Sequence, residues 1–497
     1  MSSQLLPFGP GAKIFIACYL LSLLVVGAVG FRARRNDSMK DFYLAGPGIG
    51  FVVLLLTLYS TQYSGNTMMG FTGKAYRDGF SWAACIHFMT AIVVIYLFFA
   101  PKLYRVAKAN NFLTPADFVE HRFQMPSLTL CTSVVMTVAI SNYLLAQLLA
   151  MGRVLEGLAP DDPESKYRAF VAGIIVLAFI IVVYESLGGF RAVAWTDVIQ
   201  GSVLMLGFFI LIGMVLRNYG SIENSTRDLL ESNPKNLAVP SAAKCREWGS
   251  YIILVGLGGA LYPQALQRIY AARSATTLRR SLLVMAFLPL TTTLIAVIVG
   301  VIGAAQFPGY STTESDTILF VICREIQQQS TFGYCLVVVL FSAVLAAIMS
   351  TADSVLLSIS SMITNDIYGR HFNTSASQKQ LTRFGKVCSW TLIVIVTFAA
   401  IQLRNTTLVN LLDRKFDLLV QLSPAFLIGI HWQKLNAKAT LLGLTIGVII
   451  SLGLAFSGNQ KPFGIHAGLY GLLANVIVAV SFSLLSSDKQ SNRPALA

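Results

Sequence analysis

Two long apolar runs are interrupted by glycine and polar residues, the run 48–73 by Ser60-Thr-Gln-Tyr-Ser-Gly65-Asn66 and the run 249–271 by Gly256-Leu-Gly-Gly-Ala-Leu-Tyr262-Pro263-Gln264. Proline has no amide hydrogen to donate and its ring clashes one turn back, so a helix is expected to unwind at Pro263. Inside a bilayer, freed carbonyl groups are tolerated only where protein or a water-filled cavity satisfies them. Two such breaks, five apolar runs apart, predict an inverted repeat of five plus five helices. The alternative is that glycine and proline only pack membrane helices closely.

The composition excludes an ordinary water-soluble protein. Of 497 residues, 55% are hydrophobic and only 12% are charged, against about 25% charged in soluble domains. The mean hydropathy is +0.66. The net charge of +14 comes from Lys and Arg residues that stand in short clusters between the apolar runs. This pattern argues against a nucleic-acid partner and favours a chain oriented in membrane lipid.

Apolar runs of spanning length predict an all-α polytopic membrane protein, because each crossing needs about 20 apolar residues. We expect thirteen transmembrane helices, at 14–31, 48–73, 80–100, 129–151, 167–186, 195–216, 249–271, 281–305, 331–362, 385–403, 407–431, 439–456 and 464–485. Two longer connections, 217–248 and 306–330, leave room for short surface helices.

The Lys and Arg clusters predict the orientation. Alternate connections carry more than half of these residues, in the segments 32–40, 102–122, 191, 268–280, 370–386, 434–438 and 489–493. By the positive-inside rule these segments face the cytoplasm. The N-terminus is then outside and the C-terminus inside, in a multi-pass protein of the cell membrane.

The ninth run carries hydroxyl groups along one face. Steps of three and four residues place on a single stripe Ala347, Ser350, Thr351, Ser354, Ser358 and Ser361. Hydroxyl oxygens and unwound carbonyls are hard ligands that suit a small hard cation, and no His or Cys cluster accompanies them. We therefore expect sodium here. The alternative is a helix interface held by hydrogen bonds between Ser and Thr residues.

Two carboxylates favour the functional interpretation of this stripe. An acid within a membrane helix costs several kcal/mol and is a functional candidate by default. Asp353 lies on the ninth run, three residues after Ser350. Asp197 begins the sixth run near the cytoplasmic boundary, where hydration from that side is the alternative. A cation could bridge Asp197 and the ninth helix if the two helices touch.

A series of short motifs extends along nearly the whole chain. In order they are Phe42-Tyr-Leu-Ala-Gly46, Gly73-Lys-Ala-Tyr76-Arg-Asp-Gly79, Thr114-Pro-Ala-Asp117 with Arg122-Phe123, Gly188-Gly189-Phe-Arg191-Ala-Val-Ala-Trp195-Thr-Asp197-Val-Ile-Gln200, Gln267-Arg268 with Ala271-Ala272, Ala346-Ala-Ile-Met-Ser-Thr351, Asp366-Ile-Tyr368 and Asn436-Ala437-Lys438. This order resembles the sodium/solute symporter family, and most closely its proline and pantothenate branch.

The resemblance implies a leucine-transporter-like fold in a single transmembrane domain, 1–497. Ten helices would form the two inverted repeats, 48–216 and 249–431. One extra helix, 14–31, would precede them and two further helices, 439–485, would follow.

The resemblance also implies where sodium binds. One ion would lie between the broken second helix and the ninth, held by backbone carbonyls of Ser60, Tyr63 and Ala347 and by side-chain oxygens of Ser350 and Thr351. A second ion would use Asp197, Ser350, Asp353 and Ser354. Family members carry Ser where Asp353 stands here, so Asp353 either strengthens this second site or binds a proton instead.

The solute is expected at the two breaks, bounded by the second, third, seventh and eleventh helices. The expected lining residues are Gln62, Ser64, Asn66, Thr67, Trp82, Ile86, Tyr143, Tyr262 and Gln264. They supply amide, hydroxyl and aromatic groups and no fixed cation, so the charge of a carboxylate would be balanced by half-helix dipoles or bound sodium. Proline symporters carry an acid where Gln62 stands, and sialic acid symporters an arginine near Tyr143, which argues against both solutes.

These observations predict a sodium-coupled symporter that imports a small organic solute, such as pantothenate, another small carboxylate or an amino-acid-like compound. The alternatives are a transporter-like membrane sensor and a sodium-dependent channel. A membrane enzyme lacks support, because the sequence shows no nucleophile elbow, phosphate loop or cluster of His, Cys and acidic residues.

Overall fold

The computed structural model describes residues 10–33, 38–45, 48–157, 159, 162–312, 314–404 and 408–486. Within these ranges the chain is helical and forms no β-strand. One isolated backbone bridge joins Ile49 to Ala272. The predicted all-α class is confirmed for the described residues.

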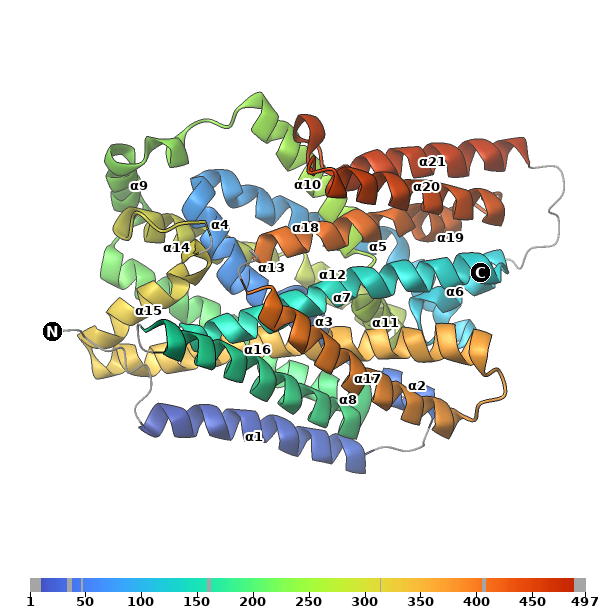
Figure 1. Ribbon diagram of the computed structural model, residues 1–497, viewed down its shortest axis with the longest axis horizontal. Coiled ribbons are helices and arrows are strands. Elements are labelled where there is room, and N and C mark those ends of the chain that lie inside the picture. Colours follow the sequence, from blue (N-terminus) through green and yellow to red (C-terminus); the bar gives the residue numbers. More distant parts are fainter. Residues whose placement is uncertain are drawn as a thin grey trace.

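The first half of the chain consists of helical elements, and the longest of them run roughly along the horizontal direction of Figure 1. They are α1 (Pro10–Arg32), α2 (Met39–Leu44), α3 (Phe51–Gln62), η1 (Asn66–Gly70), α4 (Phe71–Asp78), η2 (Gly79–Ala83), α5 (Ala84–Asn110), α6 (Pro115–Phe123), α7 (Pro126–Glu156), α8 (Pro163–Tyr219), α9 (Ile222–Ser232) and η3 (Pro234–Leu237). The short helix α9 occupies the first of the two long connections, as expected.

The second half begins with the other broken helix. Its elements are α10 (Ala242–Gly259), α11 (Pro263–Ala271), α12 (Ala275–Met285), α13 (Leu288–Thr291), α14 (Thr293–Gln306), η4 (Glu314–Thr317), α15 (Ile318–Gln329), α16 (Thr331–Met362), η5 (Ile363–Phe372), α17 (Gln378–Gln402), α18 (Leu408–Leu419), η6 (Val420–Leu422), η7 (Pro424–Ile428), α19 (Gly429–His431), α20 (Ala437–Phe456), η8 (Pro462–Gly464) and α21 (Ala467–Leu485). Helix α15 lies in the second long connection.

Both interruptions expected from the sequence are present. Helix α3 ends at Gln62, Tyr63 has extended backbone angles, and the π-helical turn η1 follows. Helix α10 ends at Gly259, and α11 leaves it at an angle of 49°. The chain turns where Pro263 begins the new helix, as the missing amide hydrogen predicts.

The spans identified by helix length and composition are fewer than the apolar runs. Among the described residues, nine helices are long and apolar enough to cross a membrane, or ten if α10 and α11 count as one. Helix α8 alone covers two of the predicted runs, 167–186 and 195–216. These helices identify a multi-pass membrane protein, and the count of thirteen stays a prediction.

Helix α8 changes direction at Gly189. This residue has φ 58° and ψ −150°, a conformation that only glycine adopts readily. A Cβ atom there would also overlap the carbonyl oxygen of Phe42. The bend and the close approach of α2 therefore both require glycine.

We expect Gly189→Ala to lower the free energy of unfolding by at least about 1–3 kcal/mol through backbone strain, before the overlap with Phe42 is added. The control is Gly213→Ala on the same helix, where a Cβ atom meets nothing within 4 Å. Thermal unfolding and the yield of monodisperse protein measure both variants. Equal stability of the two would contradict this account of the bend.

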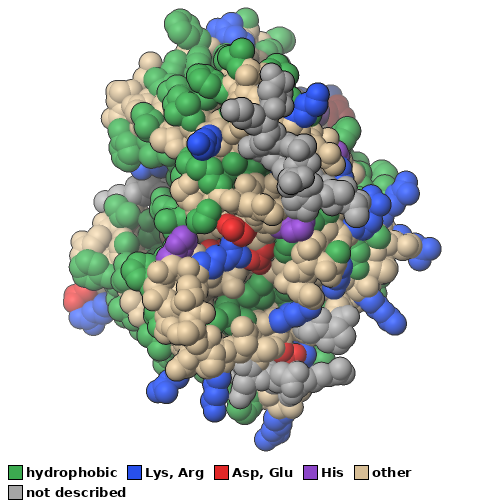
Figure 2. All heavy atoms as spheres, turned by 90° about the vertical axis from the view of Figure 1, so that its right-hand side faces the viewer, with side chains coloured by type: hydrophobic (Ala, Val, Ile, Leu, Met, Phe, Trp, Pro, Cys, Tyr) green, Lys and Arg blue, Asp and Glu red, His purple; other side chains and the backbone are tan. Residues whose placement is uncertain are grey.

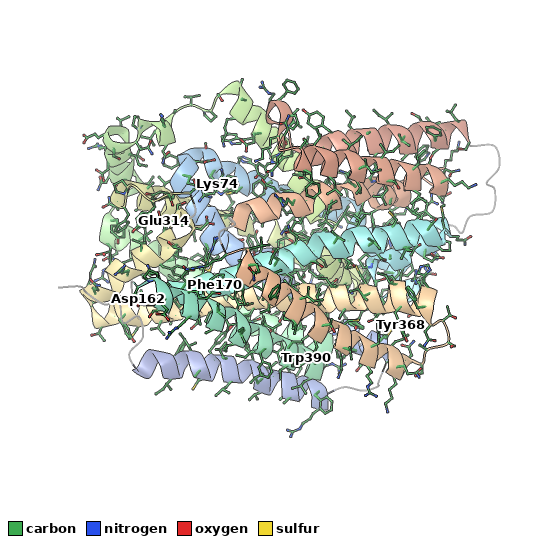
Figure 3. The ribbon with its side chains drawn as sticks, viewed as in Figure 1. Lys74, Asp162, Phe170, Glu314, Tyr368 and Trp390 are labelled. Atoms are coloured by element: carbon green, nitrogen blue, oxygen red, sulfur yellow. The ribbon has the colours of Figure 1, made fainter. Side chains whose placement is uncertain are left out.

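The end of the bundle at α6 carries many basic side chains. Helix α6 lies at the right-hand end in Figure 1, with the start of α17, and α9 lies at the opposite end. Figure 3 labels Asp162 and Glu314 toward the α9 end and Tyr368 toward the α6 end. Figure 2 looks onto the α6 end, where Lys and Arg side chains are spread widely and acidic ones are few.

Candidate functional site

The break after α3 contacts α16. The Thr351 hydroxyl donates hydrogen bonds to the carbonyl oxygens of Ala347, at 3.1 Å, and of Ser60, at 3.3 Å. A Cβ atom at Gly65 would overlap the side chain of Ile348, so the break approaches α16 more closely than a larger residue allows. The unwound stretch and the hydroxyl-bearing helix therefore meet inside the protein.

Three of the five expected ligands of the first sodium ion meet at this contact. Ser60, Ala347 and Thr351 are linked by the hydrogen bonds above, and Tyr63 lies in the same break. Ser350 differs from them, because its hydroxyl donates to Asp197 at 2.7 Å. All five residues are almost fully buried.

Asp197 is at the centre of a second polar cluster. It is 0% exposed, so hydration from the cytoplasmic boundary does not explain it. Its Oδ1 accepts the hydrogen bond from Ser350, and its Oδ2 accepts from Thr57 and, at 2.8 Å, from Arg268. Helices α3, α8, α11 and α16 are thereby joined around one carboxylate.

Asp353 belongs to the same cluster. It accepts hydrogen bonds from Tyr184 and, at 3.1 Å, from Ser354, whose hydroxyl also accepts from Arg268. The four residues expected around the second ion thus lie together, and sequence reasoning missed Arg268, Thr57 and Tyr184 as their partners. An arginine five residues after Pro263 in an apolar run was a usable signal, because charged residues in membrane helices are rarely placed without function.

The formal charges of this cluster do not cancel. Asp197 and Asp353 carry two negative charges when ionised, and Arg268 carries one positive charge. Arg268 also donates to Thr57 at 2.7 Å and to the carbonyl of Gln264 at 3.0 Å, so its donors are largely engaged. One negative charge is left, which a sodium ion or a proton could neutralise.

A pocket lies beside the first contact, between the two breaks. It is lined by Gln62, Ser64, Thr67, Phe71, Trp82, Phe88, Met89, Ile92, Tyr143, Tyr251, Val255, Tyr262, Asp413, Lys415 and Phe416. Tyr143 and Tyr262 stack with their planes 7° apart.

A family model described as the Sodium:solute symporter family matches residues 42–447. The chain belongs to this family. It is 25% identical to the osmoregulated proline transporter OpuE of Bacillus subtilis, over 97% of this chain and 96% of that protein. It is also 25% identical to the sodium/pantothenate symporter of Haemophilus influenzae, over 93% and 95% of the two chains.

Solved structures agree in fold. A Na⁺-coupled sialic acid symporter in a substrate-bound, outward-open state superimposes with a TM-score of 0.80 at 20% identity, covering 98% of this chain and 100% of the other. MHP1, a nucleobase-cation-symport-1 family transporter, superimposes with a TM-score of 0.55 at 13% identity, over 92% and 98%. The predicted resemblance is confirmed: this sodium:solute symporter is a sodium-coupled transporter and not an enzyme.

Six of the nine solute-lining residues expected from the sequence do line the symporter's pocket. They are Gln62, Ser64, Thr67, Trp82, Tyr143 and Tyr262. Ile86 and Gln264 are not among the lining residues, and the side chain of Asn66 lies outside the described part of the chain. The amide of Gln264 is buried without a hydrogen-bond partner in the structure.

The pocket also contains a lysine, which the lining expected from the sequence did not include. Helix α18 brings Lys415 into it, with the side chain 1% exposed. The Lys415 Nζ lies 3.0 Å from the centroid of the Tyr143 ring and 4.8 Å from that of Tyr262. The sequence carried the signal, because Asp413, Arg414 and Lys415 stand together inside the apolar run 407–431.

Asp413, two residues earlier, belongs to a chain of ion pairs beside the pocket. The pairs are Lys74–Asp78 at 3.2 Å, Asp78–Lys244 at 2.9 Å, Lys244–Glu247 at 3.2 Å, Glu247–Lys461 at 2.8 Å and Lys461–Asp413 at 3.4 Å. Figure 3 labels Lys74, on α4. Burial opposes the charged form of Lys461, but Asp413 and Glu247 outweigh it and raise its pKa. Lys461 is therefore a charged partner for Asp413.

Proposed function

We propose that this symporter imports a small organic solute with sodium by alternating access, and that the first sodium ion binds where the break after α3 meets α16. The contact between Thr351 and the Ser60 carbonyl carries the proposal, because it joins the two elements through oxygen atoms. Its ligands are the carbonyls of Ser60, Tyr63 and Ala347 and the hydroxyls of Ser350 and Thr351. The solute occupies the adjacent pocket.

The spacing of the oxygens supports this ion site. A hard cation of calcium's size takes oxygen ligands at roughly 2.3–2.6 Å, so ligands at right angles are roughly 3.3–3.7 Å apart. Thr351 Oγ1 lies 3.3 Å from the Ser60 oxygen and 3.1 Å from the Ala347 oxygen. Sodium, of similar radius, therefore fits with a small adjustment. Ser350 must turn from Asp197 to join them.

Coupling follows if sodium binds the outward-open form better than the inward-open form. An ion with equal affinity for both forms shifts neither. Binding between α3 and α16 ties the two elements together and completes the wall of the solute pocket, and release inside loosens them. The membrane potential adds about 2.3 kcal/mol per charge per 100 mV to the concentration gradient.

The cluster around Asp197 holds a second cation in this proposal. Asp197, Ser350, Asp353 and Ser354 supply its oxygens, and the uncompensated negative charge of the cluster supports a monovalent ion. Asp353 gives this symporter a carboxylate where relatives would have a hydroxyl. The ion is sodium or a proton.

The arrangement of the chain is part of the proposal. The segments 48–216 and 249–431 form the two inverted repeats, and 14–31 and 439–485 lie outside them. The α6 end faces the cytoplasm of the cell, which places the N-terminus outside and the C-terminus inside. Support comes from exposed basic residues near that end, among them Lys108, Lys379, Arg383, Lys434 and Lys438.

Sodium should stabilise the purified protein without any solute. We expect the unfolding temperature to rise when sodium chloride replaces potassium chloride at equal ionic strength, because a ligand at 100 times its Kd adds about 2.7 kcal/mol of stability. A thermal-shift titration in detergent measures this. Identical curves in both salts would overturn the proposed coupling ion.

A further inference from the structure

Lys415 is a buried basic side chain that neither proposed sodium site uses. Its Nζ lies among three aromatic rings, with centroids 3.0 Å away for Tyr143, 4.8 Å for Tyr262 and 4.9 Å for Phe416. Ring faces attract a cation but do not replace the hydration that an ammonium group loses on burial. The Lys415 amine therefore stays protonated in this pocket only while an anion lies near it.

The described residues provide no such anion. None of their carboxylate oxygens lies within 4.0 Å of the Lys415 Nζ, and none of their groups forms a hydrogen bond with it. Asp413 lines the same pocket, but it accepts hydrogen bonds from Tyr251 at 2.7 and 2.8 Å and pairs with Lys461 at 3.4 Å. The acid nearest in sequence is already compensated, so the Lys415 amine has no acid of its own among the described lining residues.

The other lining residues indicate which further groups of a ligand this pocket can bind. Gln62, Ser64 and Thr67, from the break and η1, offer amide and hydroxyl groups. Much of the remaining lining is apolar or aromatic, from Trp82, Phe88, Met89, Ile92 and Val255. No uncompensated acid among the described lining residues would receive an ammonium group.

We propose that Lys415 is the counter-ion of the transported solute, and that this solute is a small monocarboxylate with no ammonium group. The carboxylate pairs with the Lys415 ammonium, the amide and hydroxyl groups bind polar atoms of the solute, and the apolar wall holds its carbon skeleton. The inference rests on the proposed function, since it assigns the solute class of the same pocket. It replaces the half-helix dipole or bound sodium as the source of counter-charge.

The experiment compares acids with their uncharged analogues in sodium chloride. The pairs are pantothenate with pantothenol, propionate with propionamide and pyruvate with pyruvamide, and proline serves as a zwitterion. We expect at least one acid to raise the unfolding temperature of the wild-type protein, its analogue and proline to have no effect, and Lys415→Met to bind that acid at least 100-fold more weakly. Arg414→Met, which removes an exposed positive charge one residue away, should stay within twofold of wild type.

The sodium response separates the two proposals. Lys415→Met should keep the sodium-dependent rise in unfolding temperature, which also shows that this variant folds. If the wild-type protein shows no such rise, the proposed function fails, and not only the role of Lys415. The Lys415 proposal is overturned if no acid binds a wild-type protein that responds to sodium, if acid and analogue bind alike, or if Lys415→Met binds the acid as well as wild type. The wild-type comparison decides even where Lys415→Met does not fold.

Discussion

We expect sodium-dependent stabilisation to disappear when Ser350→Ala and Thr351→Ala are combined. The two substitutions remove both side-chain oxygens from the proposed first sodium site, and the Thr351 hydroxyl is also the contact between α16 and the Ser60 carbonyl. We expect the double variant to lose at least 100-fold in sodium affinity and sodium-dependent solute uptake to fall to background. Thermal shift in sodium against potassium measures the first effect without knowledge of the solute.

The single variants should not be equivalent. The Ser350 hydroxyl contacts Asp197, whereas the Thr351 hydroxyl contacts the break after α3. Thr351→Ala alone should therefore cause most of the loss at the first site. The control is Ser342→Ala with Ser358→Ala, which removes two α16 hydroxyls with no hydrogen bond to another described helix. A full sodium response in Ser350→Ala/Thr351→Ala would refute the assigned site.

The sequence predicted the elements of the fold because their causes are local. Pro263 cannot donate an amide hydrogen wherever it lies, so the break between α10 and α11 follows from chemistry within one turn. The hydroxyl stripe on α16 follows from helical periodicity alone. The inference that this stripe meets the α3 break needed the family resemblance, and the contact of Thr351 with Ser60 bears it out.

The partners across the bundle could not be predicted in the same way. Periodicity states which residues share a face but not which helix that face meets. Arg268 reaches Asp197 because α11 turns away from α10 and packs beside α3, an arrangement set by tertiary structure. Lys415 was visible as a basic residue in an apolar run, but its place beside Tyr143 and Tyr262 depends on how α18 packs against α7 and the second break.

Arg268→Met should be among the most destabilising single substitutions in this symporter. Arg268 is 1% exposed and pairs with Asp197, which is 0% exposed. Removing one member of a buried ion pair costs about 3–5 kcal/mol, because the remaining charge is left without compensation. In this cluster the formal charge would change from −1 to −2. Thermal unfolding and the yield of folded protein should both fall sharply. Arg273→Met, five residues on and exposed, is the matched control.

Asp197→Asn tests whether charge is the cause. With Arg268→Met, it returns the formal charge of the cluster to −1, carried by Asp353. The amide that replaces the carboxylate keeps one oxygen as an acceptor for Thr57 or Ser350, and its NH2 group can donate to the other hydroxyl oxygen. We expect the double variant to recover more than half of the stability lost in Arg268→Met, because the uncompensated carboxylate is gone. Recovery would identify Arg268 as the fixed counter-charge that leaves one negative charge for a transported cation. If the double variant is as unstable as Arg268→Met, the hydrogen bonds of Arg268 to Thr57 and the Gln264 carbonyl, rather than its charge, hold α11 in place.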